Sequence, residues 1–152
     1  MESVYTRMSQ KGIVLPKALE PVGIYLPVQQ TGNLLFISGQ GCIENGVQLK
    51  GRAGVDVSTQ EAARRAEVCM RNTLAAVEAY LGSLDRVKKP VKLLGFVAGD
   101  DRFTEQAVVI NAASQLLLDV FGESGRHARS AIGTNSLPLG LTVEIESIFE
   151  IA

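Results

Sequence analysis

The sequence predicts a single α+β domain in which two helices cover one face of a mixed β-sheet. Two stretches carry apolar residues at helical spacing, and strand-like stretches precede, separate and follow them. A chain of 152 residues without repeats, low-complexity tracts or linkers suits one hydrophobic core. Residues 34–37 and 93–97 are apolar on both faces and need cover on both sides. Because two helices supply only one cover, we expect the other face to meet a further subunit of a homo-oligomer.

Composition and charge argue against several classes of function. Hydrophobic residues make up 46% of the chain and the net charge is −1, which gives no electrostatic reason to bind nucleic acid or an anionic membrane. No apolar run is long enough to cross a bilayer. The N-terminus has no apolar signal core, so we expect a cytoplasmic protein with neither nucleic acid nor membrane as a partner.

The N-terminal part of the sequence predicts a short helix or arm, an irregular stretch and then a strand. Residues 3–10 form the helix or arm, which ends at Gly12. Residues 15–23 contain too much proline for regular structure. A first strand is expected over residues 25–29, followed by a turn at residues 31–33.

A β-hairpin comes next in the sequence. Asn45-Gly46 separates the strand-like residues 34–43 from a second short strand, and both central residues of such a turn need a positive φ. Gly39 and Gly41 interrupt the longer strand. Glycines at these positions indicate a β-bulge or the close approach of a ligand.

Two helices and a strand follow the hairpin. Ser58 begins the first long helix, with Glu61 completing a capping box, and Gly82 ends it. A strand is expected over residues 91–98. The second helix is expected over residues 104–122.

The last part of the chain holds the first candidate functional groups. Arg129 stands in a run of small residues, where a bulky cation needs a partner, and Leu137-Pro138 breaks the chain before the last strand. Arginine can hold a carboxylate through two charge-assisted hydrogen bonds, and a glutamate such as Glu144 can position or deprotonate a water. Side chains alternate along that strand: Leu141, Val143, Ile145, Phe149 and Ile151 face one side, and Thr142, Glu144, Glu146, Ile148 and Glu150 the other. A half-buried strand shows the same alternation with no catalytic role, and Arg129 could reach a cleft or only pair with Glu144.

The residue types that bind metals or form nucleophilic sites are scarce. Cys42 and Cys69 have no C-x-x-C spacing and apolar neighbours, so we expect two buried thiols. His127 is the only histidine, which leaves little from which to build a transition-metal site. No Ser-His-Asp set or cofactor motif is present, so we expect no cofactor. Asn111 lies in the second helix away from its apolar stripe, and most asparagines at such positions are simply solvated.

Several short segments match a known family in their order and spacing. They are Gly23-Ile24-Tyr25, Gly32-Asn33, Ser38-Gly39-Gln40, Val109-Ile110-Asn111-Ala112, Ala128-Arg129-Ser130, Leu137-Pro138 and Val143-Glu144-Ile145-Glu146. With these segments the sequence resembles the RidA/YjgF family of reactive enamine/imine deaminases, which older naming also calls the endoribonuclease L-PSP family. The likeness covers nearly all of the chain from Tyr25 onward. It places residues 1–22 in an N-terminal extension and residues 23–152 in the family domain.

The resemblance implies a chorismate-mutase-like α+β fold and a homotrimer with ligand clefts between neighbouring subunits. It also implies hydrolysis of 2-imino or enamino acids to 2-oxo acids and ammonia, without a cofactor. Two alternatives remain open. One is a non-enzymatic trimer that binds a small carboxylate or regulates a partner, and the other is an endoribonuclease. The single histidine and the short basic pairs at residues 64–65 and 88–89 argue against the endoribonuclease.

The resemblance also implies roles for individual residues. Arg129 matches the arginine that grips the substrate carboxylate, and Glu144 the glutamate that holds or activates the attacking water. Tyr25 matches a tyrosine that lines the cleft from the neighbouring subunit. Gly39 matches a position that meets the ligand through its backbone, and Asn111 an asparagine near the site.

Two positions depart from the family pattern. Ala131 stands where most members have a cysteine, two residues after the arginine. That cysteine contributes mainly backbone contacts, which alanine can keep, so Ala131 is expected to bind substrate through its backbone. Ile24 replaces the proline of the family's glycine-proline-tyrosine, which implies a different cleft shape.

Overall fold

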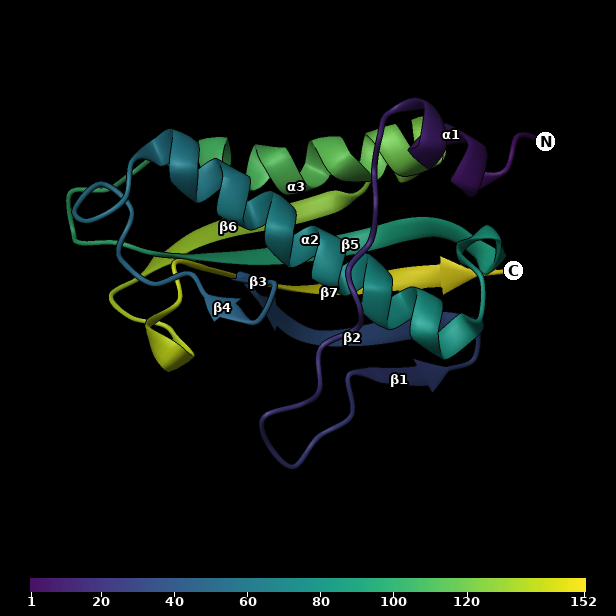
Figure 1. Ribbon diagram of the computed structural model, residues 1–152, viewed down its shortest axis with the longest axis horizontal. Coiled ribbons are helices and arrows are strands. Elements are labelled where there is room, and N and C mark those ends of the chain that lie inside the picture. Colours follow the sequence, from purple (N-terminus) through teal and green to yellow (C-terminus); the bar gives the residue numbers. More distant parts are fainter.

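A computed structural model describes all 152 residues as a five-stranded sheet covered on one face by helices (Figure 1). The helices are α1 (Val4–Gln10), α2 (Thr59–Leu81) and α3 (Gln106–Phe121). The strands are β1 (Val28–Thr31), β2 (Leu34–Gly41), β3 (Ile43–Glu44), β4 (Val47–Gln48), β5 (Val87–Ala98), β6 (Ala128–Thr134) and β7 (Val143–Ile151). Short 3₁₀ turns η1 (Leu84–Arg86), η2 (Gly122–Gly125) and η3 (Pro138–Gly140) connect them. None of the helices combines the length and apolar character that crossing a bilayer requires.

The sheet has the strand order β1-β2-β7-β5-β6 and is mixed. Only β5 and β6 run parallel, and every other pair is antiparallel. Helix α2 lies over β2 and β7, and α3 lies beside it over β5 and β6 (Figure 1). The predicted α+β fold, with two helices on one face of a mixed sheet, is confirmed.

The long helix α2 begins and ends where the sequence predicts. The Ser58 hydroxyl accepts a hydrogen bond from the Glu61 N–H at 3.1 Å, and Gly82 ends the helix with a φ of 83°. Only half of the capping box forms, because the Glu61 carboxylate turns to Arg64 at 2.8 Å instead of to the start of the helix.

The two faces of the sheet differ in how they are covered. Side chains beneath the helices are buried, and Leu35, Leu93 and Phe149 have no exposed surface. On the open face, Phe36 and Ile132 keep 43% and 45% of their surface exposed. An apolar face of this kind is what the predicted association with another subunit would cover.

Several predicted boundaries need correction, and prolines explain two of them. The strand expected over residues 25–29 is β1, Val28–Thr31, because Pro27 has no N–H to give to the ladder. Strand β5 begins at Val87, earlier than residue 91, since Pro90 sits at a register shift where a missing N–H is tolerated. Helix α3 begins at Gln106 and ends at Phe121.

The predicted turn and bulge are both present. Asn45 and Gly46 have φ values of 51° and 78° between β3 and β4, as the hairpin requires. The register of β2 against β7 shifts between Ile37 and Gln40, so the predicted bulge surrounds Gly39. Cys42 and Cys69 are free and buried, as expected.

The N-terminal segment is anchored to the helical layer before it reaches the sheet. The Val4 N–H and the Ser3 hydroxyl both donate to Asp85, and the Tyr5 hydroxyl donates to Glu78 at 2.7 Å. The chain then crosses α2 and forms a loop before β1 (Figure 1). This path brings residues 19–27 to the edge of the candidate site.

Replacing Gly125 by alanine is expected to destabilise the fold by about 1–3 kcal/mol, because the added methyl group overlaps backbone that has no room to move. Its Cβ would contact the Leu117 carbonyl oxygen and lie 2.8 Å from the carbonyl carbon. Chemical denaturation measures this loss. The control is Glu123→Ala in the same 3₁₀ turn, which removes an exposed side chain and should change the free energy of unfolding by less than about 0.5 kcal/mol. Equal stability of Gly125→Ala and wild type would contradict the packing argument.

Candidate functional site

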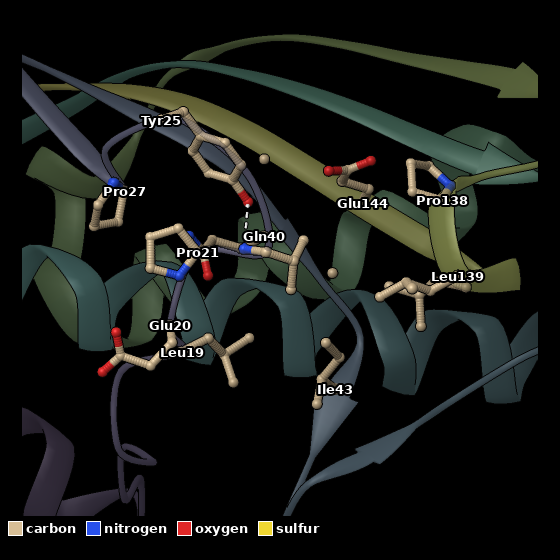
Figure 2. A pocket seen from close by; sticks show the side chains of 14 residues that line it. Leu19, Glu20, Pro21, Tyr25, Pro27, Gln40, Ile43, Pro138, Leu139 and Glu144 are labelled. Carbon is tan, nitrogen blue, oxygen red and sulfur yellow. Dashed lines mark hydrogen bonds between the residues drawn. The ribbon is translucent and has the colours of Figure 1, made fainter.

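A small pocket of about 120 Å³ opens beside Glu144, between the loop before β1, the bulge of β2 and the turn before β7 (Figure 2). Tyr25 and Gly39 line it together with Glu144. Figure 2 shows the Tyr25 ring on one side of the pocket and Leu139 on the other. Leu139 has a φ of 63°, an unusual value for a bulky residue that brings strained backbone to the pocket wall.

Gly39 is what allows the Glu144 carboxylate to lie against β2. A Cβ on Gly39 would contact Oε1 of Glu144 and lie 2.9 Å from its Cδ. The bulge turns Gly39 toward β7, and the absent side chain leaves the space that the carboxylate fills. The group that approaches Gly39 closely is therefore the Glu144 side chain of the same chain.

The Glu144 carboxylate has the electrostatic properties of a base. It is half-buried, and no arginine, lysine or histidine forms an ion pair with it. Burial raises the pKa of Glu144 above its ordinary value of 4.5, and the charge of Glu146 raises it further. A carboxylate with a raised pKa holds a proton more readily, which suits it to accept one from water near neutral pH.

Tyr25 stands at the rim of this pocket on the loop before β1. The residue is 46% exposed, and its hydroxyl accepts a hydrogen bond from the Val22 N–H at 3.4 Å. The residues beside it are exposed too, with Ile24 completely accessible in the single chain. This loop therefore offers apolar surface to whatever lies next to the pocket.

Arg129 lies in a second group of residues, on β6 against α3. Its Nη1 donates to Asn111 Oδ1 at 2.8 Å and to Ser114 Oγ at 3.2 Å, and its Nη2 donates to the Ala107 carbonyl at 3.3 Å. All three acceptors are neutral, and Arg129 has no ion pair in the chain. The helical pattern alone favours a solvated Asn111, but the structure makes it a direct hydrogen-bond partner of Arg129.

These contacts leave two N–H donors of Arg129 without a partner. A guanidinium has five N–H donors, and three are used on α3. The remaining donors are on Nε and Nη2, two atoms that share one edge of the guanidinium. A carboxylate accepts two parallel hydrogen bonds from such an edge.

The two groups do not meet within one chain. Strand β6 forms the edge of the sheet, where Arg129 pairs with Leu93, while Glu144 lies on β7 opposite Phe96, with β5 between them. The Arg129 side chain is on the helix face, because it bonds to α3, whereas Glu144 belongs to the open face. Arg129 therefore does not pair with Glu144 in the same chain. Ala131, half-buried on β6, lies opposite Gly95 near the Arg129 group.

Ser114 and His127 also belong to the Arg129 group, although the sequence analysis does not predict either as a site residue. Ser114 follows Asn111 by three residues on α3, so both side chains lie on one helix face. The His127 ring lies 2.9 Å from the Ser114 hydroxyl. The spacing of Asn111 and Ser114 was a signal for a shared partner, but nothing in the sequence connects His127 to α3.

Replacing Gly39 by alanine is expected to slow any reaction that uses Glu144 by about tenfold to a hundredfold, because the methyl group displaces the carboxylate. Stability should change by less than about 1 kcal/mol, since the contact is with the end of a flexible side chain. The double variant with Glu144→Gln should be no slower than Glu144→Gln alone, because both changes act on one group. Additive losses in that kinetic comparison would contradict the displacement argument.

Comparison with known proteins gives a match along almost the whole chain. Residues 5–148 match the family model described as "YjgF/chorismate mutase-like, putative endoribonuclease". Protein TCP17 of Trypanosoma cruzi is 38% identical, with 97% of this chain and 94% of that protein covered. The 2-iminobutanoate/2-iminopropanoate deaminase of Dermatophagoides farinae is 31% identical, with 93% and 97% covered.

A solved structure agrees with these relatives. The crystal structure of the protein Atu1372 from Agrobacterium tumefaciens, described as having unknown function, is 44% identical and covers 98% of this chain and 94% of its own. Its TM-score of 0.89 shows the same fold. The matched residues 5–148 include both groups of the candidate site. As its motifs predict, the chain belongs to the RidA/YjgF family of chorismate mutase-like fold.

Proposed function

We propose that this protein is a hydrolytic deaminase that converts 2-imino acids to 2-oxo acids and ammonia. The observation that carries the proposal is the state of Arg129, whose guanidinium is held by three neutral acceptors and has two donors free on one edge. A positioned guanidinium without a carboxylate partner is suited to bind the carboxylate of a small substrate.

The complete site would form between two chains of a homotrimer. Arg129 and Glu144 lie on different faces of the sheet, so a ligand that meets both needs a second subunit. The open face supports such an assembly, since Phe36 and Ile132 expose apolar surface there, and the loop containing Ile24 and Tyr25 does so beside the pocket. The family resemblance supplies the number of subunits.

In the proposed reaction, Arg129 holds the substrate carboxylate and thereby fixes the imine carbon. Glu144 accepts a proton from a water while the water oxygen bonds to that carbon. The π electrons of the C=N bond move to the nitrogen, which takes up a proton from solvent to give a tetrahedral amino alcohol. Protonated Glu144 then returns its proton to the nitrogen, which leaves as ammonia as the C–N bond breaks, and the hydroxyl proton passes to solvent as the C=O bond forms. The water oxygen remains as the carbonyl oxygen of the 2-oxo acid.

The other candidate residues would assist this chemistry. Asn111 holds Arg129 through the shortest of its hydrogen bonds. Gly39 leaves the space for Glu144, and the backbone of Ala131 could bind substrate as the family cysteine does. Tyr25 would close the cleft against the neighbouring subunit. The relative from Dermatophagoides farinae, named as a deaminase of two small aliphatic imino acids, supports substrates of this size.

An RNA-cleaving activity, the third reading of the sequence, finds less support. Every residue of the two basic pairs forms an ion pair with a neighbouring glutamate. Arg64 and Arg65 pair with Glu44 and Glu61, and Lys88 and Lys89 share Glu150. A phosphate backbone needs unpaired cations along its path. His127 is hydrogen-bonded on both ring nitrogens and has no second histidine with which to share acid and base roles.

The test generates imines in place with an amino-acid oxidase and follows their decay in a buffer without free amines. Wild type should accelerate the decay, and Arg129→Ala should not. Failure of wild type across aliphatic, polar and aromatic imines would overturn the deaminase. The function would then be that of a trimer that binds a small carboxylate, provided that calorimetry detects Arg129-dependent binding of a 2-oxo acid.

Sedimentation tests the proposed trimer separately, since three chains of 16.3 kDa are readily distinguished from one.

A further inference from the structure

A chain of hydrogen bonds runs from the only histidine of the sequence to Arg129. His127 Nδ1 lies 2.7 Å from the Gly125 carbonyl oxygen, and His127 Nε2 lies 2.9 Å from Ser114 Oγ. Ser114 Oγ in turn accepts from Arg129 Nη1 at 3.2 Å. The three side chains come from β6, α3 and the segment between η2 and β6, and they line one polar hollow.

The acceptor at Gly125 fixes the tautomer of the imidazole. A carbonyl oxygen cannot donate, so the hydrogen of a neutral His127 must be on Nδ1. Nε2 is then an acceptor, and the Ser114 hydroxyl donates to it. With its hydrogen directed to His127, Ser114 turns its lone pairs to Arg129.

No other charged group competes for this arrangement. Arg126 beside the histidine pairs with Glu123, and Asp119 on α3 pairs with Lys11. Arg129 itself has no carboxylate partner in the chain. The orientation of its guanidinium therefore depends on neutral acceptors, two of which are side chains on α3.

We propose that Ser114 and His127 are positioning residues that hold Arg129 with its free Nε and Nη2 edge directed at the ligand carboxylate. The proposal rests on the proposed function for the role of Arg129. Neither Ser114 nor His127 needs to touch the ligand. Each acts by limiting the rotamers of the arginine, which reduces the entropy lost when a carboxylate binds.

The first test concerns the hydrogen-bond chain itself and does not depend on any ligand. Because His127 is the only histidine, the imidazole ¹⁵N spectrum of tag-free protein contains one residue. At pH 8 it should show the Nδ1–H tautomer, and Ser114→Ala should shift the Nε2 resonance. An Nε2–H tautomer in wild type would overturn the proposal.

The second test measures the effect on binding, with 2-oxobutanoate as the probe. His127→Phe and Ser114→Ala should each weaken binding about threefold to tenfold, the effect of losing one neutral hydrogen bond, with little change in melting temperature. His127→Gln keeps an acceptor for Ser114 and should restore binding to within about twofold of wild type. Equal affinity of His127→Phe and wild type would overturn the positioning role. Binding to neither wild type nor any variant would instead contradict the proposed function, while the ¹⁵N spectrum still decides on the hydrogen-bond chain.

Discussion

Arg129→Ala is expected to weaken the binding of a small 2-oxo acid by about 30-fold to 1,000-fold and to abolish detectable imine turnover. The substitution removes a guanidinium that has no carboxylate partner in the chain. It also removes the two N–H donors on the Nε and Nη2 edge that are free to bind a ligand carboxylate. Truncating one partner of a hydrogen-bonded charge pair costs about 2–4 kcal/mol when the other partner is left without a substitute. Calorimetry with 2-oxobutanoate measures the loss of affinity, and the oxidase-coupled assay measures turnover.

Stability should be nearly unchanged by the same substitution. Arg129 is only half-buried, so water can reach the oxygens of Asn111 and Ser114 that lose a donor. We expect a change in the free energy of unfolding below about 1 kcal/mol. A large loss of stability would mean that Arg129 is a structural residue whose loss affects binding indirectly.

Two further arginine variants sharpen the result. Arg129→Lys keeps the charge but lacks the planar pair of donors, so it should bind more weakly than wild type and more tightly than Arg129→Ala. Arg126→Ala removes a neighbouring arginine that is exposed and paired with Glu123. Its affinity should match wild type. If Arg126→Ala lost as much affinity as Arg129→Ala, the overall positive charge of this region would explain the binding. The assignment of Arg129 as the specific carboxylate-binding residue would then be wrong.

Most of the fold could be predicted because local chemistry and global packing agree along most of the chain. The Ser58 cap, the Gly82 stop and the Asn45-Gly46 turn each need particular residues, and each is present where the sequence indicates. The predictions were less accurate where proline shifts a boundary through tertiary context. Pro90, for example, reads as a strand breaker, yet a register shift accommodates it inside β5.

The candidate site was harder to predict because its residues belong to two groups that one chain does not bring together. Arg129 and Glu144 are close in sequence, but the parallel pairing of β6 with β5 puts the arginine at the sheet edge and on the helix face. Closeness in sequence does not reveal that a third strand, β5, lies between β6 and β7, or that the two side chains lie on opposite faces of the sheet. The contact of His127 with α3 depends likewise on how η2 folds back, which no local pattern specifies.

Glu144→Gln is expected to slow the chemical step of imine hydrolysis by about 10²–10⁴-fold while changing the affinity for 2-oxobutanoate by less than about threefold. Glutamine keeps the shape of the side chain and the contact with Gly39, but it cannot accept the proton of the attacking water. Single-turnover kinetics separates the chemical step from binding. Weak binding with an unchanged chemical step would assign Glu144 a structural role.

The stability of the glutamine variant provides an independent check on the environment of Glu144. A carboxyl group whose pKa is raised on folding contributes stability below its unfolded pKa and loses that stability as the pH rises through the folded pKa. Burial raises the pKa of Glu144 in this way. At pH 8 the wild-type protein has therefore lost this stability, because its buried carboxylate is ionised. Glu144→Gln has no group to ionise there, so its melting temperature at pH 8 should be at least as high as that of wild type. A clearly lower melting temperature at pH 8 would show that the ionised carboxylate is stabilised by a partner.

The pH dependence of the rate connects the two glutamates of the open face. Because Glu144 acts as its ionised form, the rate should fall toward acid pH, with a midpoint above the ordinary carboxyl value of 4.5. The charge of Glu146 contributes to the raised pKa of Glu144, so Glu146→Gln should move this midpoint to lower pH and leave the rate at pH 8 within about threefold of wild type. A midpoint that does not move would remove Glu146 as a cause. A Glu146→Gln variant as slow as Glu144→Gln would mean that the catalytic carboxylate had been assigned to the wrong glutamate.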